Sequence, residues 1–284
     1  MSIRVENISY VYMPGSPFER QALEDVSFTI EKGEFVALIG HTGSGKSTLA
    51  EHLNGLLNPA KGQVYVDEVD LSGKAEEVKA AKIKVGMVFQ YPEHQIFAET
   101  VYEDIAFGPR NSGKGEKMVE EAVKKAMKFV GLDFEKFSQR SPFQLSGGQM
   151  RRVAIAGVVA MEPDYLILDE PSAGLDPKSR NAIFTQLVNL YKERNIGIVL
   201  ITHSMEEAAQ YANRLLVMSK GKLVIDGKTK EVFAEKRDVL TEVGVDVPQA
   251  VKLSDLLQTS GLKIEQAYTK DELLSNILKA KGWS

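Results

Sequence analysis

Residues 40–47 place three glycines, a lysine and hydroxyl residues directly after an apolar run. They fit the pattern G-x-x-x-x-G-K-[ST], in which glycines let backbone N–H groups surround phosphate oxygens at the start of a helix. In this pattern Lys46 reaches the β- and γ-phosphates, and the Ser47 hydroxyl binds Mg²⁺. We therefore expect a nucleotide-phosphate site lined by Gly40, His41, Thr42, Gly43, Ser44, Gly45, Lys46, Ser47 and Thr48.

Two carboxylates, Asp169 and Glu170, end a second apolar run at residues 165–168. Open α/β sheets bind ligands at the carboxyl ends of their strands, which is where these carboxylates fall. Asp169 is suited to hold Mg²⁺ through its water shell, and Glu170 to orient or deprotonate an attacking water. An acidic turn before Pro171 is the alternative, and the phosphate loop elsewhere in the chain disfavours it.

A second phosphate-binding device is expected at residues 145–149, Leu-Ser-Gly-Gly-Gln. A serine and two glycines open a helix here, and the N-terminus of a helix attracts anions. The five residues resemble the signature of the ATP-binding cassette (ABC) ATPases. In that family the signature of one subunit covers the γ-phosphate held by the other. The resemblance therefore implies a dimer with ATP between its subunits, contacted here by Ser146, Gly147, Gly148 and Gln149.

Other positions match this family in order along the chain. Gln90 falls at the Q-loop and His203 at the switch histidine, so the resemblance assigns catalytic roles to Gln90, Lys46, Glu170 and His203. It assigns Mg²⁺ to Ser47, Gln90 and Asp169. Asp176 matches the D-loop, which touches the partner subunit across the nucleotide. Tyr12 is the preferred candidate to stack on adenine, with Tyr10 as its rival on the same strand face.

Residues 91–109 resemble the ATPases of energy-coupling factor (ECF) transporters, including the cobalt/nickel branch, and residues 14–19 resemble the second, A′-type subunit. The resemblance implies pairing with a related ATPase subunit, as a homodimer or heterodimer. It also implies a transmembrane coupling subunit that docks near residues 93–109, and a substrate-binding membrane component, in a system that takes up vitamins or metal ions. We expect an acidic docking groove with apolar anchors, formed by Glu93, Glu99, Glu103, Asp104, Ile96, Phe97 and Phe107.

Three alternatives remain open at this point. The chain is the ATPase of another ABC transporter class, or a soluble ABC protein without a membrane partner. Soluble ABC proteins typically carry two cassettes or a long coiled-coil insertion, and this sequence has one cassette and no heptad run. Residues 93–109 also fit a solvated acidic loop that docks nothing.

Alternating apolar segments and helical patterns predict an α/β fold with a parallel sheet covered by helices. Strands are expected at 3–12, 22–30, 34–40, 63–66, 85–90, 165–168, 198–202, 215–218 and 223–225, and helices at 46–57, 115–130, 177–194 and 205–213. The resemblance specifies a P-loop NTPase with a RecA-like core, an N-terminal antiparallel β-subdomain and an inserted helical subdomain at about 91–161. We expect the ATP-binding domain to span 1–236. A small helical extension at 237–284 is expected to pair subunits.

Composition excludes several other kinds of protein. The net charge is −4, so the chain lacks the basic field that nucleic-acid binding requires. The absence of cysteine excludes disulfides and thiolate catalysis. The longest apolar stretch, 153–161, is too short to cross a bilayer. We therefore expect a chain without a signal peptide that lies peripherally on the cytoplasmic side of the membrane.

Overall fold

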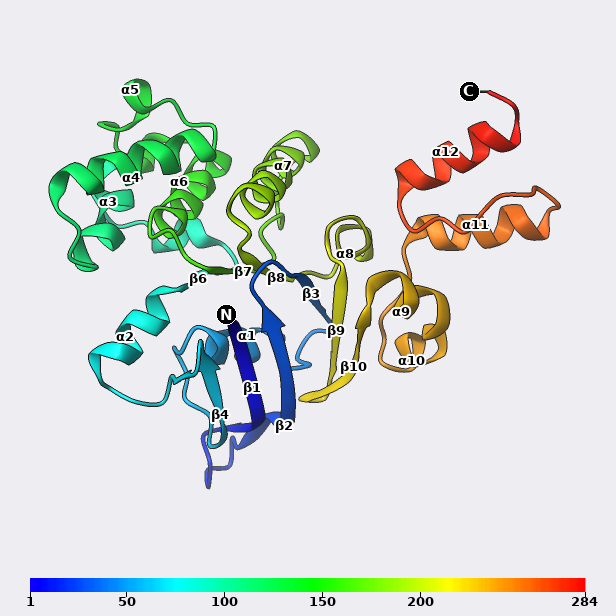
Figure 1. The fold of residues 1–284 in the computed structure, drawn as a ribbon, viewed down its shortest axis with the longest axis horizontal. Coiled ribbons are helices and arrows are strands. Elements are labelled where there is room, and N and C mark those ends of the chain that lie inside the picture. The colour runs from blue at the N-terminus through cyan, green and yellow to red at the C-terminus, as the bar shows by residue number, and fades with distance from the viewer. Residues whose placement is uncertain (284) are drawn as a thin grey trace.

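The structure is a computed structural model that describes residues 1–283 and contains two sheets (Figure 1). An antiparallel sheet has the order β2-β1-β4-β5, and a larger sheet has the order β10-β9-β3-β8-β7-β6. The strands of the first sheet are β1 (Ser2–Tyr12), β2 (Arg20–Glu31), β4 (Lys61–Val66) and β5 (Val69–Asp70). Those of the second are β3 (Phe35–Ile39), β6 (Val85–Val88), β7 (Tyr165–Asp169), β8 (Gly197–Ile201), β9 (Arg214–Ser219) and β10 (Lys222–Lys228).

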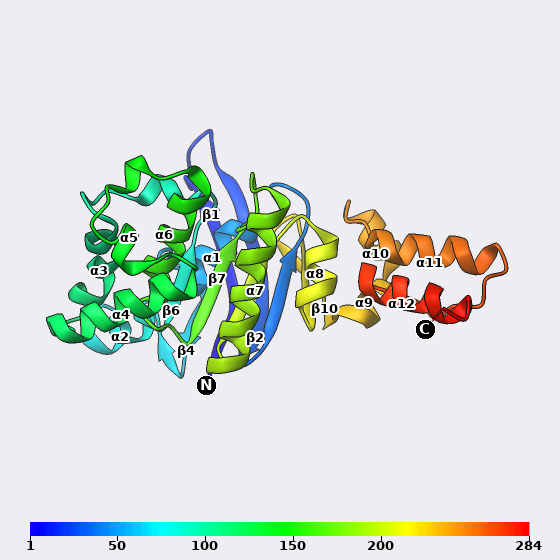
Figure 2. The same cartoon turned by 90° about the horizontal axis from the view of Figure 1, so that it is seen from above.

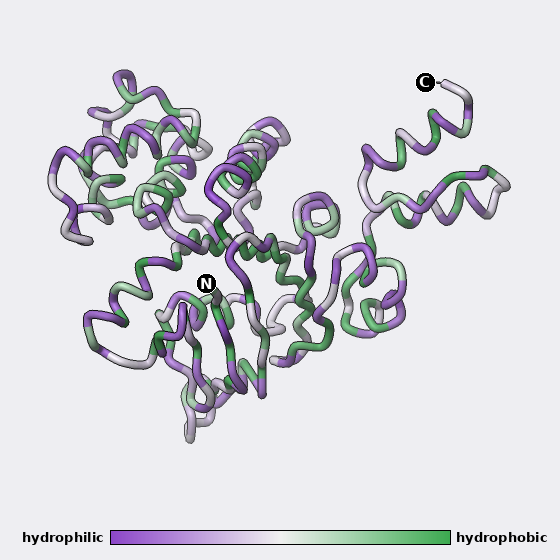
Figure 3. Tube along the Cα trace, in the orientation of Figure 1, coloured by the Kyte–Doolittle hydropathy of each residue, from purple (hydrophilic) through white to green (hydrophobic). Residues whose placement is uncertain are grey.

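All neighbouring strands of the larger sheet run parallel except β9 and β10, which form an antiparallel hairpin at its edge. Every residue of β3, β7 and β8 is buried, as expected for parallel strands covered on both faces. One hydrophobic cluster lies between this sheet and the helices, and another lies between it and the antiparallel sheet. Figure 3 shows the apolar residues concentrated along these central strands. The predicted α/β fold with its N-terminal antiparallel sheet is confirmed.

A helical subdomain is inserted between β6 and β7 (Figure 1). Its elements are η1 (Pro92–Gln95), α3 (Val101–Asn111), α4 (Glu116–Phe129), α5 (Phe134–Phe137), η2 (Pro142–Gln144) and α6 (Gly147–Val159). Val119, Val123 and Met127 lie on one face of α4 and are fully buried, as the helical periodicity predicts.

Several boundaries differ from the sequence prediction. Helix α1 (Lys46–Leu53) ends four residues early, because Asn54 ends the helix and Gly55 adopts a left-handed backbone with φ 73°. Helix α2 (Glu76–Ile83) was not predicted. It is two turns long and buries only Val78 and Ala81, which is too short a pattern to show a clear periodicity.

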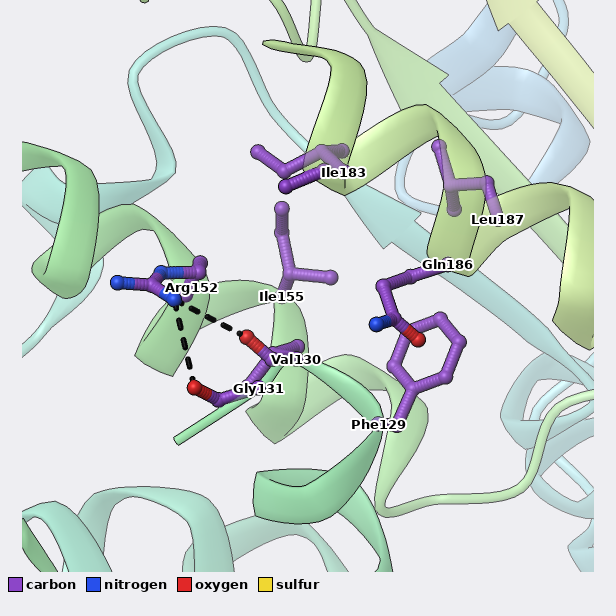
Figure 4. Close-up of a pocket in the computed structure, with 9 residues that line it drawn as sticks. Phe129, Val130, Gly131, Arg152, Ile155, Ile183, Gln186 and Leu187 are labelled. Carbon is purple, nitrogen blue, oxygen red and sulfur yellow. Dashed lines mark hydrogen bonds between the residues drawn. The ribbon is translucent and has the colours of Figure 1, made fainter. Parts of the chain in front are cut away.

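The helical subdomain meets α7 (Pro177–Arg194) across an incompletely filled seam (Figure 4). A cavity of about 80 Å³ lies between the end of α4, α6 and α7, with Phe129, Ile155 and Leu187 in its lining. The Arg152 guanidinium donates across 3.4 Å to the carbonyls of Val130 and Gly131, just past the end of α4. This seam therefore contains a small space that side chains do not fill.

The chain continues through α8 (Met205–Tyr211), α9 (Thr229–Glu235), α10 (Arg237–Glu242), α11 (Gln249–Thr259) and α12 (Lys270–Ala280). Figure 2 shows α11 and α12 projecting at the end of the molecule opposite the helical subdomain. These two helices share a small cluster of Ala250, Ala267 and Leu273. By contrast, Leu240 and Val245 belong to the cluster of the main sheet. The main core therefore continues beyond residue 236.

Truncation tests this division of the core. A chain that ends at Val247 loses the small cluster, the partly buried Tyr268 and the exposed pair of Arg237 with Asp255, but no fully buried member of the main core, so its melting temperature should change little. A chain that ends at Lys236 also loses Leu240 and Val245, which should cost about 2 kcal/mol or more and lower the melting temperature by roughly 5 °C. Calorimetry of the two truncations makes the comparison. Equal melting temperatures would contradict the assignment of α10 to the main core.

Candidate functional site

The phosphate loop follows β3 and leads into α1. Gly40, Gly43 and Gly45 have φ of 150°, 80° and 107°, in the region that favours glycine. A Cβ atom on Gly40 would lie 2.3 Å from the Met218 carbonyl oxygen, and one on Gly45 would lie 2.6 Å from that of Ala22. Within residues 1–283 no side chain caps α1, so its first N–H groups are left to face the loop.

The polar groups of this loop fit an anion. Lys46 Nζ donates to the carbonyl oxygens of Gly40 (2.8 Å) and His41 (3.1 Å), which holds the ammonium under the loop. Burial lowers the pKa of Lys46, although the charges of Glu170 and Asp169 oppose this shift. The Ser44 hydroxyl is buried and has no hydrogen-bond partner within residues 1–283. A bound phosphate would compensate the buried positive charge.

The Glu170 carboxylate joins two other predicted catalytic residues. Its Oε2 accepts a hydrogen bond from Gln90 Nε2 at 3.1 Å, and its Oε1 lies 2.9 Å from His203 Nε2. Gln90 follows β6, Glu170 follows β7 and His203 follows β8, and these strands are neighbours in the sheet. Since they run parallel, residues 80 and 33 positions from Glu170 meet at one edge. The structure thus assembles the cluster that the motifs predicted.

Asp169 lies beside the phosphate loop and is 6% exposed. Burial raises its pKa and the nearby Glu170 charge raises it further, while a hydrogen bond from Ser47 and the Lys46 charge oppose this. The Ser47 hydroxyl, the Asp169 carboxylate and the free Oε1 of Gln90 are hard oxygen donors that fit Mg²⁺. Residues 1–283 contain no group of three His, Cys, Asp or Glu side chains that would hold a metal. A Mg²⁺ here would therefore depend on phosphate and water oxygens as well.

A cavity of about 180 Å³ extends from the phosphate loop to the end of β1. Tyr12 lines it, is 37% exposed, and its hydroxyl lies 3.2 Å from Thr48 Oγ1. Tyr10 is not among the lining residues, and packs edge-on against Tyr12 and His52 at ring separations of 5.0 and 4.8 Å. This geometry favours Tyr12 over Tyr10 as the surface for a base.

Arg20 also lines this cavity, and no motif in the sequence indicated it. It pairs with Tyr12 in the β1–β2 ladder, and its Nη2 lies 3.0 Å from the point that a Cβ on Gly43 would occupy. The one indication of Arg20 in the sequence was the short connection between these two strands, which returns the chain beside Tyr12. Arg20 thus places a second cation, besides Lys46, next to the phosphate loop.

The signature residues lie on another part of the chain. Ser146 caps α6 in a capping box with Gln149, and both Ser146 and Gly147 are exposed. None of residues 145–149 lines the cavity at the phosphate loop within the described chain. Asp176 caps α7 by accepting from the N–H groups of Lys178 and Ser179, and the Ser179 hydroxyl bond keeps the pKa of Asp176 low. Contact of Ser146, Gly147, Gly148, Gln149 and Asp176 with a partner's nucleotide stays a prediction.

Most of the acidic side chains expected to form a groove after Gln90 are paired within the chain, and the docking groove stays a prediction. Glu93 pairs with Arg151, Glu103 pairs with Arg110, and Asp104 accepts from the backbone N–H groups of Phe97 and Ala98. The sequence could not show these pairings, because the partners lie on other turns or helices. A hollow of about 410 Å³ lies here, and its lining includes Asp104 as well as Lys82 and Gln95. Most of the lining is apolar: Ile83, Val85, Gly86, Met87, Ile96, Phe107, Gly108, Ala154, Gly157, Val158 and Met161.

Two aromatic side chains are exposed on this segment, beside the polar His94, Gln95, Glu99 and Glu103. Phe97 is 61% and Phe107 50% exposed, and their rings pack edge to face at 4.9 Å. Exposed aromatic residues beside an apolar hollow are typical of a protein-binding surface.

Within residues 1–283, no helix is both long enough and apolar enough to cross a bilayer.

Comparisons with known proteins agree with this site. Residues 23–173 match the family model described as ABC transporter. This chain belongs to the ABC transporter ATPases, and it binds and hydrolyses ATP. It is 51% identical over 280 residues to an energy-coupling factor transporter ATP-binding protein EcfA2 from Clostridium tetani, covering 98% of this chain and 97% of that one. The counterpart in Bacillus licheniformis is 48% identical, with coverage of 99% and 97%. Within the family, the chain belongs to the ATP-binding proteins of ECF transporters.

Solved structures support the same assignment. The chain matches cbiO1 from Clostridium perfringens, described as part of the ABC transporter complex cbiONQ, with a TM-score of 0.73 and 36% identity. This match covers 90% of the present chain and 98% of the other. The ATP-binding cassette MJ0796, solved as a dimer in a post-hydrolysis state with ADP and Pi, matches with a TM-score of 0.71 and 29% identity, over 80% and 98%.

Asp169→Asn tests the electrostatic cost of the buried carboxylate. A raised pKa means that the charged form of Asp169 destabilises the folded protein. This destabilisation is absent below the pKa that Asp169 has in the unfolded chain, and it is complete once the pH has risen through the pKa that it has in the folded protein. Without nucleotide, the variant should melt above the wild type at about pH 7, and this difference should shrink near pH 4. Thermal unfolding at both pH values measures it. A variant that melts below the wild type at neutral pH would contradict this explanation.

Arg20→Ala tests the second cation. An exposed charge contact is worth about 1 kcal/mol or less, so the dissociation constant for MgATP should rise about fivefold. Binding of a fluorescent ATP analogue measures it, with the adjacent exposed residue changed in Gln21→Ala as a control. Unchanged affinity in Arg20→Ala would show that the guanidinium does not contact the nucleotide.

Proposed function

We propose that this chain binds MgATP at an interface with a second, related ATPase subunit and uses its hydrolysis to power uptake of a vitamin or metal ion through membrane partners. One observation carries the chemical part. The Glu170 carboxylate lies between Gln90 and His203, beside the phosphate loop that holds Lys46. The relatives' names, which describe ECF transporter ATP-binding proteins, support the transport part.

In this proposal the phosphates lie against the N–H groups of the loop and Lys46, with Tyr12 against the adenine ring. Glu170 orients the attacking water and accepts its proton, and its two oxygens are positioned for this by Gln90 and His203. In the assembled site His203 would contact the γ-phosphate. Mg²⁺ bound through Ser47, Asp169 and Gln90 would neutralise charge on the β- and γ-phosphates. Positioning and charge stabilisation then account for most of the rate.

The second subunit completes the site in this proposal. Ser146 and Gly147 are exposed at the start of α6 and would meet the γ-phosphate held by the opposing subunit. The relative cassette MJ0796 was solved as a dimer, which supports such pairing. The extension at 237–284 would add to the pairing surface, since Leu256, Leu274 and Trp283 are 66%, 54% and 67% exposed there.

The membrane partners would bind the opposite end of the molecule. We propose that a transmembrane coupling subunit docks on the surface around Phe97 and Phe107, within residues 93–109, and that a separate membrane component binds the solute. The relative cbiO1 is described as part of a complex with other subunits, which supports an assembly of this kind. The chain would then lie peripherally on the cytoplasmic side of the membrane.

Glu170→Gln tests the chemical role. The amide keeps the size of the side chain but cannot accept the water's proton, so turnover should fall at least a hundredfold while ATP binding and ATP-dependent subunit association persist. Phosphate release and light scattering measure the two properties. Glu193→Gln, an exposed glutamate on α7, is the matched control. Hydrolysis at the wild-type rate in Glu170→Gln would contradict the assigned role.

The docking surface is tested by Phe97→Ala combined with Phe107→Ala. Loss of the exposed aromatic pair should sharply reduce co-purification with the transmembrane subunit, because such anchors carry much of the binding energy of an interface. ATP hydrolysis by the ATPase subunits alone should be unchanged. Met118→Ala, another exposed apolar residue of the helical subdomain, serves as the control. Full co-purification of the double variant would rule this surface out.

A further inference from the structure

Ser172 and Ala173, which follow the Glu170-Pro171 pair, are held from two sides by buried charged residues. The Ser172 hydroxyl donates to Glu207 Oε1 at 2.6 Å. The Ala173 carbonyl oxygen accepts from Arg151 Nη1, and the Ala173 N–H donates to the Glu170 carbonyl oxygen at 3.1 Å. This two-residue segment is therefore bonded directly to Glu170 and clamped by side chains from two other helices.

Glu207 holds one side of the segment. It lies on α8, is 2% exposed, and accepts a second hydrogen bond from Thr202 Oγ1 at 2.6 Å. Arg180 on α7 completes its partners at 2.8 Å. A buried carboxylate is tolerated only when it is paired and hydrogen-bonded, which fixes all three donors around it. Since Thr202 directly precedes His203, Glu207 connects the segment that carries His203 to the segment that carries Glu170.

Arg151 holds the other side. It lies on α6, two residues after Gln149, and is 3% exposed. Its Nε and Nη2 donate to the two oxygens of Glu93 at 3.1 and 3.0 Å, so the pair is bidentate. A planar guanidinium bound to both carboxylate oxygens has one favoured geometry. Arg151 therefore connects the start of the 93–109 segment to Ala173.

Glu170 itself needs such support. Its backbone has φ 48°, a left-handed conformation that costs a non-glycine residue about 1 kcal/mol or more and persists only where the surroundings enforce it. The Glu170 N–H donates to the Ile201 carbonyl oxygen at 3.0 Å, which fixes the end of β7 before the turn. The hydrogen bonds of Ser172 and Ala173 fix the turn that follows.

We propose that Arg151 and Glu207 are positioning residues: by clamping Ser172 and Ala173 they set the Glu170 carboxylate against His203 and tie it to residues 93–109. This inference rests on the proposed function, because it assigns the clamp to the hydrolytic step. It follows that a shift of residues 93–109 reaches Glu170 through the pair of Glu93 with Arg151. Neither positioning residue contacts the nucleotide cavity.

Steady-state kinetics of MgATP hydrolysis, in the chain assembled with its partner ATPase, test the proposal. Arg151→Lys keeps the charge but loses the bidentate pair, and Glu207→Gln keeps the shape but loses the charge. Each should lower kcat about tenfold to a hundredfold, the effect of a small displacement of a catalytic group, while KM changes less than threefold. Arg152→Lys and Glu206→Gln are matched controls on the same helices and should keep kcat within twofold.

Two further measurements distinguish a failure of the clamp from a failure of a variant to fold. If Glu207→Gln does not fold, Ser172→Ala removes the same contact with less disturbance and should lower kcat with KM unchanged. A double-mutant cycle of Glu93→Gln with Arg151→Lys should be non-additive in kcat, since both changes break one pair. Suppose that Glu170→Gln abolishes turnover while Arg151→Lys and Glu207→Gln keep the wild-type kcat. The clamp is then wrong and the proposed function stands. If Glu207→Gln does not fold, Ser172→Ala takes its place in this comparison. If Glu170→Gln retains turnover, the proposed function itself is wrong.

Discussion

The constraint on which the rest of the structure depends is the shared sheet edge at which β6, β7 and β8 end, where the Glu170 carboxylate is held between Gln90 and His203. This contact exists because the three strands run parallel and end at the same edge of one sheet. The strands are buried on both faces, so their ends are set by core packing and not by the polar residues themselves. The helices, the inserted subdomain and the antiparallel sheet all pack on these strands. The strand ends therefore determine where a proton acceptor such as Glu170 can lie.

In the proposed function, a second constraint is that the site of one chain is incomplete. The loop around Lys46 supplies the backbone cradle and the buried cation, while Ser146 and Gly147 face outward from a different subdomain. Arg151, which follows the signature on α6, reaches the Ala173 carbonyl and so joins the signature helix to the segment after Glu170. The surface proposed for the membrane partner lies on the same subdomain. In the proposed mechanism, docking and hydrolysis would be linked through the contacts of Arg151 with Glu93 and Ala173.

Local chemistry explains what the sequence could predict. The phosphate loop is recognisable because Gly40 and Gly45 satisfy backbone conformations and close approaches that other residues cannot. Asp169 and Glu170 are recognisable because they end a buried strand. The parallel sheet followed from uninterrupted apolar runs.

Long-range pairing explains what it could not predict. Glu93 looked like part of an acidic surface, but its partner Arg151 is 58 residues away. Arg20 carried no motif, and only the β1–β2 ladder places it beside Tyr12. The end of α1 at Leu53 depended on the left-handed Gly55. In each case the deciding interaction is absent from the local pattern of residue types.

The central claim, that ATP is held between the phosphate loop of one subunit and the signature of another, is tested most directly by disulfide cross-linking. This chain has no cysteine, so on its side only the introduced residue can react, and any native cysteines of a different partner subunit are first replaced. A cysteine at Ser146 is combined with one in the phosphate loop of the opposing ATPase subunit, at Thr42 where that subunit is a second copy. With hydrolysis blocked by Glu170→Gln, an intersubunit disulfide should form rapidly with MgATP and slowly without nucleotide, because it requires Cα atoms within about 7 Å. Cross-linking that does not depend on ATP, or that fails while ATP is bound, would contradict the account.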